Sequence, residues 1–220
     1  MTTLPTPPQA VLFDCDGLLV DSEPWWERAE MDMYARRGLV LTAEERPALM
    51  GRSTWEVAGM FAEVFDEPGQ IDALAHELLD SVAALVRANI EPMPGALDLV
   101  RMIAETGVPM AVVSNSPRDV VQASLDGSGL NALIHEIVGS EDVTTPKPAP
   151  DPYLVACARC GAAPRASVGF EDSPVGLASV VAAGLATVVV PSKGVGVLTG
   201  DLVVPSLADP ALTAWIASWR

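Results

Sequence analysis

The chain has 220 residues, of which half are hydrophobic and 19% are charged; it can bury a substantial core, and this composition excludes a disordered chain. It carries 29 acidic residues against 13 basic ones, for a formal net charge of -16. A surface this acidic repels phosphate backbones and anionic lipids, so we expect neither nucleic acid nor a membrane surface as a partner. Because three cysteines are too few for a disulfide scaffold and the start of the chain has no signal-peptide pattern, we expect a cytoplasmic protein.

Short apolar runs mark the predicted strands, and in the longer segments between them the apolar residues have helical spacing. Unbroken apolar runs are typical of strands buried on both faces, as in a parallel sheet covered by helices. The predicted strands are 10–13, 110–113, 167–170, 187–190 and 202–204, and the predicted helices around them are 96–105, 118–125, 153–160, 175–183 and 211–219. This alternation predicts a doubly wound, Rossmann-like α/β core with a parallel sheet.

One region interrupts the alternation. Between residues 22 and 91 the apolar spacing is helical, without a convincing strand: Trp25, Ala29 and Met33 fit one helix, and 73–86 fits another. We therefore expect a small all-helical domain at 22–91, called the cap here, inserted into a discontinuous core made of residues 1–21 and 92–220.

Two pairs of carboxylates follow predicted strands. Asp14 and Asp16 come where the first strand ends and, being two residues apart in an extended chain, face the same way. Gly17 then allows a tight turn, and Glu171 and Asp172 follow another strand of the same sheet. Two like charges about 4 Å apart repel by about 4 kcal/mol at an effective dielectric near 20, and a bound cation removes this penalty. Oxygen ligands without His or Cys favour Mg²⁺.

Three helix starts have a capping residue directly before a proline, the residue favoured at the first helical position. They are Ser116-Pro117, Asp151-Pro152 and Ser173-Pro174. Two of them directly follow predicted strands, so we expect helix N-termini, which attract anions, along the carboxyl edge of the sheet.

Ser114, Asn115 and Lys147 are the candidate phosphate-binding residues. Ser114 and Asn115 end the second core strand at a helix start, where a hydroxyl and backbone N–H groups could hold a phosphoryl oxygen, although an ordinary turn has the same composition. Lys147 is one of only two lysines, and Pro146 and Pro148 restrict its backbone to extended conformations. This pattern favours a lysine whose charge is held in a functional site over one that is free in solvent.

Four motifs in chain order resemble those of the haloacid dehalogenase (HAD) superfamily of aspartate-nucleophile phosphatases, in the subfamily with a helical cap after the first motif. The motifs are Asp14-Cys15-Asp16-Gly17-Leu18-Leu19-Val20-Asp21-Ser22, Val113-Ser114-Asn115, Lys147-Pro148-Ala149-Pro150-Asp151 and Gly169-Phe170-Glu171-Asp172-Ser173. They span nearly the whole chain. Residues 21–26 are most similar to the sugar-phosphate phosphatases of this group, such as the 2-deoxyglucose-6-phosphatase-like and hexitol phosphatases.

The resemblance implies a Mg²⁺-dependent hydrolase of small sugar or polyol phosphates. Asp14 would attack the phosphorus to form an aspartyl-phosphate. Asp16 would protonate the leaving oxygen and later deprotonate the attacking water, so it must begin protonated near neutral pH. Mg²⁺ would be held by Asp14, the backbone carbonyl of Asp16 and Asp172, with Glu171 as a ligand directly or through water.

The same resemblance assigns the remaining site residues. Ser114, Asn115 and Lys147 would bind the phosphoryl group, where preorganised donors act mainly through electrostatics. The cap would supply specificity: the segment Gly51-Arg52-Ser53 is similar to a cap loop that reaches into the site, and Glu23 and Trp26 would also contact the substrate. Packing among the cap helices is the alternative role for the tryptophans. We expect a monomer, which is common in this subfamily.

Three alternatives stay open. The β-phosphoglucomutases share the cap and all four motifs, but carry a His soon after the first motif and a Lys or Arg in the cap loop. The matching positions here are Trp26 and Met50, which hold neither proton nor charge, so hydrolysis is favoured. A dehalogenase would leave Asp16 idle. A non-catalytic phosphometabolite-binding module is disfavoured because every catalytic position is intact.

Overall fold

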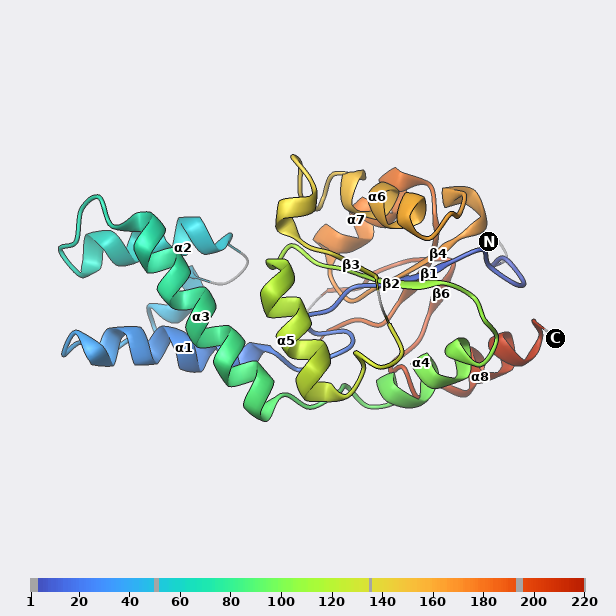
Figure 1. The fold of residues 1–220 in the computed structure, drawn as a ribbon, viewed down its shortest axis with the longest axis horizontal. Helices are drawn as coiled ribbons and strands as arrows, with labels where there is room; N and C mark the ends of the chain where they lie inside the picture. Colours follow the sequence, from blue (N-terminus) through green and yellow to red (C-terminus); the bar gives the residue numbers. More distant parts are fainter. Residues whose placement is uncertain (1–3, 50–51, 135, 193–195, 220) are drawn as a thin grey trace.

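The computed structural model describes residues 4–49, 52–134, 136–192 and 196–219. Its centre is a six-stranded sheet in the order β3-β2-β1-β4-β5-β6, in which every neighbouring pair is parallel (Figure 1). The strands are β1 Val11–Phe13, β2 Met110–Val113, β3 Glu136–Val138, β4 Val168–Glu171, β5 Ala186–Val189 and β6 Leu202–Val203. The order reverses at β1, so the carboxyl ends of β1, β2 and β4 lie side by side, where open α/β sheets bind their ligands.

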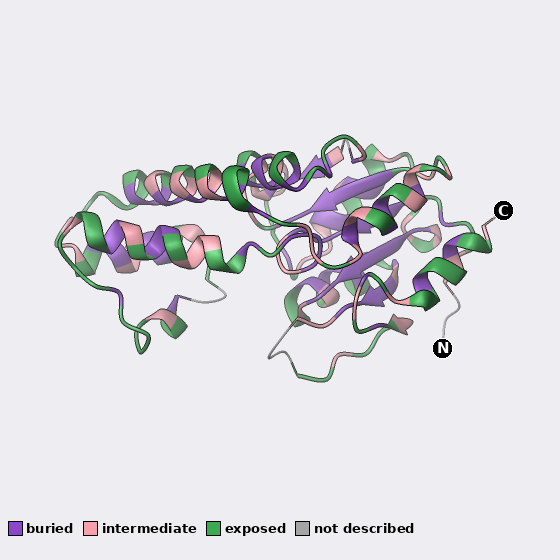
Figure 2. Ribbon diagram, turned by 90° about the horizontal axis from the view of Figure 1, so that it is seen from below, coloured by how far each residue is buried: buried purple, intermediate pink, exposed green. Residues whose placement is uncertain are grey.

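Helices cover both faces of this sheet. The helices α6 and α7 lie on one face and α4, α5 and α8 on the other (Figure 1), and the central strands β1, β2 and β4 between them are buried along their whole length (Figure 2). Their bounds are α4 Ala96–Ala104, α5 Arg118–Ser128, α6 Asp151–Arg159, α7 Pro174–Ala183 and α8 Pro210–Ala217. Burial on both sides explains the unbroken apolar runs of the strands. The predicted doubly wound, Rossmann-like sheet is confirmed.

Three helices between the first two strands extend away from the sheet (Figure 1). They are α1 Glu23–Arg36, α2 Thr54–Val64 and α3 Ile71–Asn89, with a short 3₁₀ turn at Arg46–Ala48. Each buries one stripe of side chains and exposes the other, as expected of amphipathic helices packed on one another (Figure 2). These helices form the expected helical insert, while the domain boundaries at 22–91 stay a prediction.

The long helix α3 also contacts the core, because it packs against α5 (Figure 1). The contact is close at Gly127 of α5: a Cβ there would lie 2.6 Å from Ile90 Cγ2 and 2.8 Å from the Val86 carbonyl oxygen. A residue with a side chain at this point would force the two helices apart. The C-terminal end of α3 is therefore attached to the core.

The structure differs from the sequence prediction in local details. Strand β3 is not predicted, because Glu136-Ile137-Val138 is only three residues long and begins with a charge. Ser173 caps α7 as expected, accepting from the Gly176 N–H. The other two expected starts are wrong: Pro117 and Pro150, not Ser116 and Asp151, occupy the cap positions of α5 and α6. Two further 3₁₀ turns lie at Ser140–Asp142 and Pro164–Ala166. Within the described ranges, no helix is long and apolar enough to cross a membrane.

Candidate active site

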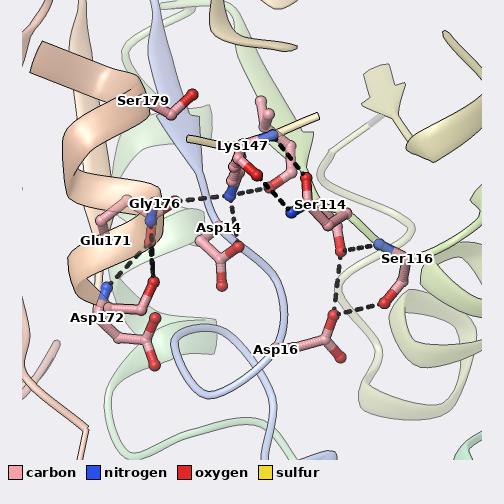
Figure 3. A network of polar contacts seen from close by, with 12 residues as sticks. Asp14, Asp16, Ser114, Ser116, Lys147, Glu171, Asp172, Gly176 and Ser179 are labelled. Atoms are coloured by element: carbon pink, nitrogen blue, oxygen red, sulfur yellow. Dashed lines mark hydrogen bonds and ion pairs between the residues drawn. The ribbon is translucent and has the colours of Figure 1, made fainter. Parts of the chain in front are cut away.

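The predicted core residues meet at the carboxyl edge of the sheet. Asp14 follows β1, Ser114 follows β2, and Glu171 ends β4 with Asp172 directly after it, while the loop before α6 brings in Lys147 (Figure 3). The parallel strand register places these strand ends together, as the sequence pattern requires. Residues more than 150 positions apart in the chain thus share one site.

Lys147 joins the two acidic motifs. Its Nζ lies 2.6 Å from Asp14 Oδ1, 2.6 Å from Glu171 Oε1 and 2.8 Å from the Val113 carbonyl oxygen (Figure 3). An ammonium group has three protons, so all three are used in these contacts. Burial lowers the pKa of Lys147, but Asp14 and Glu171 raise it by more, and the net pKa lies above its ordinary value. Lys147 is therefore charged at neutral pH.

Glu171 is almost fully buried, at 1% exposure, and both its oxygens are hydrogen-bonded. Oε1 accepts from Lys147 and from the Tyr153 hydroxyl at 2.6 Å, and Oε2 accepts from the Asp172 N–H at 3.3 Å and the Ser173 hydroxyl at 3.4 Å. A Cβ on Gly176 in the first turn of α7 would lie 2.0 Å from the Glu171 carboxyl carbon. Glycine therefore lets the carboxylate sit against the helix N-terminus, where the helix dipole favours negative charge.

Asp14, Glu171 and Asp172 form a buried acidic group that could hold a metal ion. One carboxylate oxygen from each lies within 4.8 Å of the others. Burial, only partly opposed by Lys147, raises the pKa of Asp14 well above its usual range, and burial raises the pKa of Asp172 to about 6. An all-oxygen donor set fits Mg²⁺. Because the oxygens of Glu171 already accept four hydrogen bonds, Glu171 fits a role as a ligand through water better than as a direct one.

Two small features shape the site around Asp172. A Cβ on Gly17, whose φ is 86°, would lie 2.5 Å from Asp172 Oδ2, so glycine is required for both the turn and the close approach. The Ser192 hydroxyl also donates to Asp172 Oδ2. Together they fix one oxygen of this carboxylate and confirm the expected tight turn at Gly17.

Asp16 is held apart from the acidic group by three hydroxyls. Its Oδ1 accepts from Ser22 at 2.7 Å. Its Oδ2 accepts from Ser114 at 3.0 Å and from Ser116 at 3.1 Å (Figure 3). Ser22 directly precedes α1, so the first helix of the insert begins at a residue bonded to Asp16. The Ser114 hydroxyl, expected at the phosphoryl group, is bonded to Asp16 in this structure.

The Asn115 side chain clamps the backbone of Lys147. Its Oδ1 accepts from the Lys147 N–H at 3.0 Å, and its Nδ2 donates to the Lys147 carbonyl oxygen at 3.2 Å. The amide thereby fixes the loop that carries the lysine, a role that its sequence position did not reveal. Contact of Asn115 with a substrate stays a prediction.

The side chains of the expected substrate-binding residues of the insert make no hydrogen bond or ion pair to the core site within the described part of the chain. Glu23 pairs with Arg46 at 2.6 Å, Trp26 is half-buried against the hydrophobic core, and Arg52 Nε donates to the Ala48 carbonyl at 2.6 Å. Ser53 caps α2 in a reciprocal capping box with Glu56. Gly51, like Met50 of the mutase comparison, lies outside the described residues.

Sequence reasoning did not assign four residues to the site: Ser22, Ser116, Tyr153 and Ser192. Ser22 and Ser116 lie inside or beside recognised motifs, which could have pointed to them. Ser192 follows β5 at the same edge of the sheet, so the strand-end rule could have found it. The hydroxyl of Tyr153 has a weaker signal. It lies within a predicted helix, and a tyrosine there is normally read as packing.

Comparison with known proteins gives the family. Residues 11–190 match the family of haloacid dehalogenase-like hydrolases. Fructose-1-phosphate phosphatase YqaB of Escherichia coli (strain K12) is 32% identical over 175 residues, covering 80% of this chain and 92% of that protein. Hexitol phosphatase A of the same strain is 31% identical over 216 residues, covering 92% and 93%. The crystal structure of CbbY from Rhodobacter sphaeroides in complex with phosphate has a TM-score of 0.81 at 25% identity, covering 92% of this chain and 96% of that one. The chain therefore belongs to the haloacid dehalogenase-like hydrolases and is an enzyme of the phosphatase type found in that family.

Proposed function

We propose that the protein is a Mg²⁺-dependent phosphomonoester hydrolase that acts on a small sugar or polyol phosphate through an aspartyl-phosphate intermediate. The observation that carries this proposal is the contact of Lys147 with Asp14 Oδ1, which leaves Asp14 Oδ2 without a hydrogen-bond partner among the described residues. A buried carboxylate with one oxygen fixed and the other open is arranged as a nucleophile. The phosphatases named for fructose 1-phosphate and hexitols support the substrate class.

Two steps follow from this arrangement. Asp14 Oδ2 forms a bond to phosphorus while the bond from phosphorus to the sugar oxygen breaks, and Asp16 gives that oxygen a proton. Water then attacks the phosphorus, Asp16 takes the proton of that water, and inorganic phosphate leaves with Asp14 restored. Both oxygens of Asp16 are occupied by serine hydroxyls, so Asp16 must release one of them to exchange a proton with the substrate.

Lys147 and Ser114 would stabilise the transferring phosphoryl group. All three protons of Lys147 are used, so its ammonium must exchange an existing acceptor for a phosphoryl oxygen, and the Asn115 clamp keeps its backbone in place while it does so. Asp14, Asp172 and the Asp16 carbonyl would hold Mg²⁺, with Glu171 through water. When bound, Mg²⁺ supplies Lewis-acid stabilisation of the phosphoryl charge.

We assign substrate selection to the helical insert, residues 22–91, and the chemistry to residues 1–21 and 92–220. Arg52 is exposed, and only its Nε is bonded among the described residues, so its other guanidinium nitrogens can bind an anionic or hydroxylated substrate. Glu23, Trp26 and Ser53 stay candidate contacts, with Gly51 in the adjoining loop.

The test is a phosphate-release screen over sugar and polyol phosphates, with and without Mg²⁺, on the wild type and Asp14→Asn. We expect metal-dependent turnover that falls about 10⁴-fold or more in the Asn variant. Asp98→Asn, which alters an exposed aspartate on α4, is the control and should keep wild-type turnover.

Other outcomes assign other functions. Substantial activity left in Asp14→Asn would refute the assigned nucleophile. Interconversion of hexose 1- and 6-phosphates with a bisphosphate primer would identify a mutase. Tight binding of a phosphate ester without release of phosphate would identify a binding module.

A further inference from the structure

Tyr153 is a buried polar residue beside the site that the proposed chemistry does not yet use. It lies in the first turn of α6 with 0% exposure, and its hydroxyl donates to Glu171 Oε1 at 2.6 Å. The Nζ of Lys147 lies over its ring, 5.1 Å from the ring centroid and within the range of a cation–π contact. One side chain thus touches both members of the Lys147–Glu171 pair.

The hydroxyl of Tyr153 matters because Glu171 has no solvent to complete its hydrogen bonds. A buried carboxylate is costly unless protein donors replace water. At Oε2 the donors are 3.3 and 3.4 Å away, whereas at Oε1 the Lys147 and Tyr153 contacts are both 2.6 Å. The position of the carboxylate is therefore set mainly at Oε1, by one charged donor and one neutral donor.

The neutral donor is the one that can stay in place during the reaction. Lys147 must exchange an acceptor to contact a phosphoryl oxygen, so its own contacts change in the catalytic cycle. The Tyr153 hydroxyl belongs to a fully buried ring on α6 and does not have to change its hydrogen-bond partner during the reaction. It can hold Glu171, and through it one arm of Lys147, while the ammonium turns to the phosphoryl group.

We propose that Tyr153 is a positioning residue for phosphoryl transfer: its hydroxyl fixes Glu171 Oε1 so that the Lys147 ammonium stays beside Asp14 and in reach of the phosphoryl oxygens. This inference rests on the proposed phosphoryl site. Loss of the hydroxyl leaves Glu171 free to rotate and to draw Lys147 away from Asp14. The hydroxyl of Tyr153 is bonded to Glu171 and to no other described residue, so the effect of the hydroxyl passes through Glu171.

The experiment compares Tyr153→Phe with Tyr34→Phe in the full chain. Phe keeps the ring and removes only the hydroxyl. Tyr34 is the other tyrosine of the chain, is buried in the insert against Phe61 and Phe65, and lies outside the site, so it is the matched control. The readouts are the affinity for inorganic phosphate in Mg²⁺, by calorimetry, and kcat and KM for the best ester found in the screen.

We expect Tyr153→Phe to bind inorganic phosphate about 5- to 10-fold more weakly and to lower kcat about 10- to 100-fold, the range typical of residues that orient a ligand-binding group. Tyr34→Phe should stay within about 2-fold of wild type in both. In a Glu171→Met background, which has no oxygen to accept the Tyr153 hydroxyl, the same Tyr153→Phe change should have an effect of less than about 2-fold, because the hydroxyl acts through that carboxylate.

An unchanged phosphate affinity in Tyr153→Phe, or an undiminished effect in the Glu171→Met background, overturns the inference. If the wild type turns over no ester, the proposed function fails, while the phosphate affinities still decide the role of Tyr153. A crystal structure of the wild type with Mg²⁺ and phosphate decides it without any variant. The Tyr153–Glu171 hydrogen bond should persist there with Lys147 on the phosphate, and a broken bond contradicts the proposal.

Discussion

Charged side chains are treated differently in the core site and in the helical insert. In the site, Lys147, Asp14 and Glu171 are all buried, at 6%, 8% and 1% exposure. In the insert, the paired cations are more exposed: the side chain of Arg36, paired with Glu77 at 3.0 Å, is 50% exposed, and that of Arg37, paired with Glu67, is 20% exposed. The same chemistry of ammonium or guanidinium with carboxylate therefore occurs in two environments of the same chain.

The difference indicates which part of the molecule is fixed and which can rearrange. Buried charges lose water and depend on protein donors, so their geometry is tightly determined. Exposed pairs contribute little and can break at low cost. A rigid core site can keep the reacting groups in place, while an adaptable insert can adjust to the substrate.

The largest effect should come from removing a paired cation from each region, buried in the site and exposed in the insert. Lys147→Met leaves Asp14 and Glu171 buried without their cation and should lower the free energy of unfolding by about 3–5 kcal/mol. Arg36→Met should lower it by about 1 kcal/mol or less, since water replaces the lost contact. Urea unfolding in the absence of added metal measures both. Equal losses would remove the distinction between the regions.

A smaller effect is expected from placing a methyl group at a glycine of each region. Gly17 and Gly38 both have positive φ, 86° and 72°, so alanine costs each about 1–2 kcal/mol in backbone strain. Only the Gly17 methyl would meet a side chain, Asp172 Oδ2 at 2.5 Å, whereas nothing lies within 4 Å at Gly38. Gly17→Ala should therefore also lower turnover about 10- to 100-fold by displacing an expected ligand. Comparable turnover in the two purified variants would argue against this reading of the close approach.

The smallest effect concerns Glu30, an acid of the insert that is buried, at 8% exposure. Burial raises its pKa from 4.5 to about 7, against the opposing charge of Arg46 and together with Glu23 and Glu27. The stability that its protonated form contributes is complete below pH 4.5 and lost as pH rises through about 7.

Glu30→Gln mimics the protonated form, so wild type and variant should be equally stable near pH 4. The variant should become the more stable by about 1–2 kcal/mol near pH 8. Thermal unfolding between these pH values measures the difference. Glu63→Gln, at an exposed site on α2, is the control, and a difference that does not grow with pH would contradict the assignment.

The core site could be predicted from sequence because a parallel sheet brings its strand ends together. Once β1, β2 and β4 are recognised, Asp14, Ser114 and Glu171 are known to lie at the carboxyl ends of neighbouring strands, and therefore close together. Strand β3 escapes the same rule, since three residues with a leading Glu136 do not form an apolar run. It pairs with β2 on one side only, at the edge of the sheet.

Side-chain partners could not be predicted in the same way, because one residue type serves several purposes. The amide of Asn115 can bind a ligand or a backbone, and only the fold shows that it reaches Lys147. The hydroxyl of Tyr153 is one polar atom on a packed ring. Ser53 is different: the spacing of Ser53 and Glu56 is a capping-box signature, so its place at a helix start was readable.

The contact of α3 with α5 has a mechanical consequence. Gly127 lets the backbone of α5 pack closely against Val86 and Ile90, at the C-terminal end of α3. This contact fixes that end of α3 on the core, while the rest of the helix extends into the insert. A movement of α1 and α2 relative to the sheet would therefore require rotation about this contact or bending of α3. A larger residue at position 127 would therefore change the orientation of the helical insert although it contacts none of the reacting atoms.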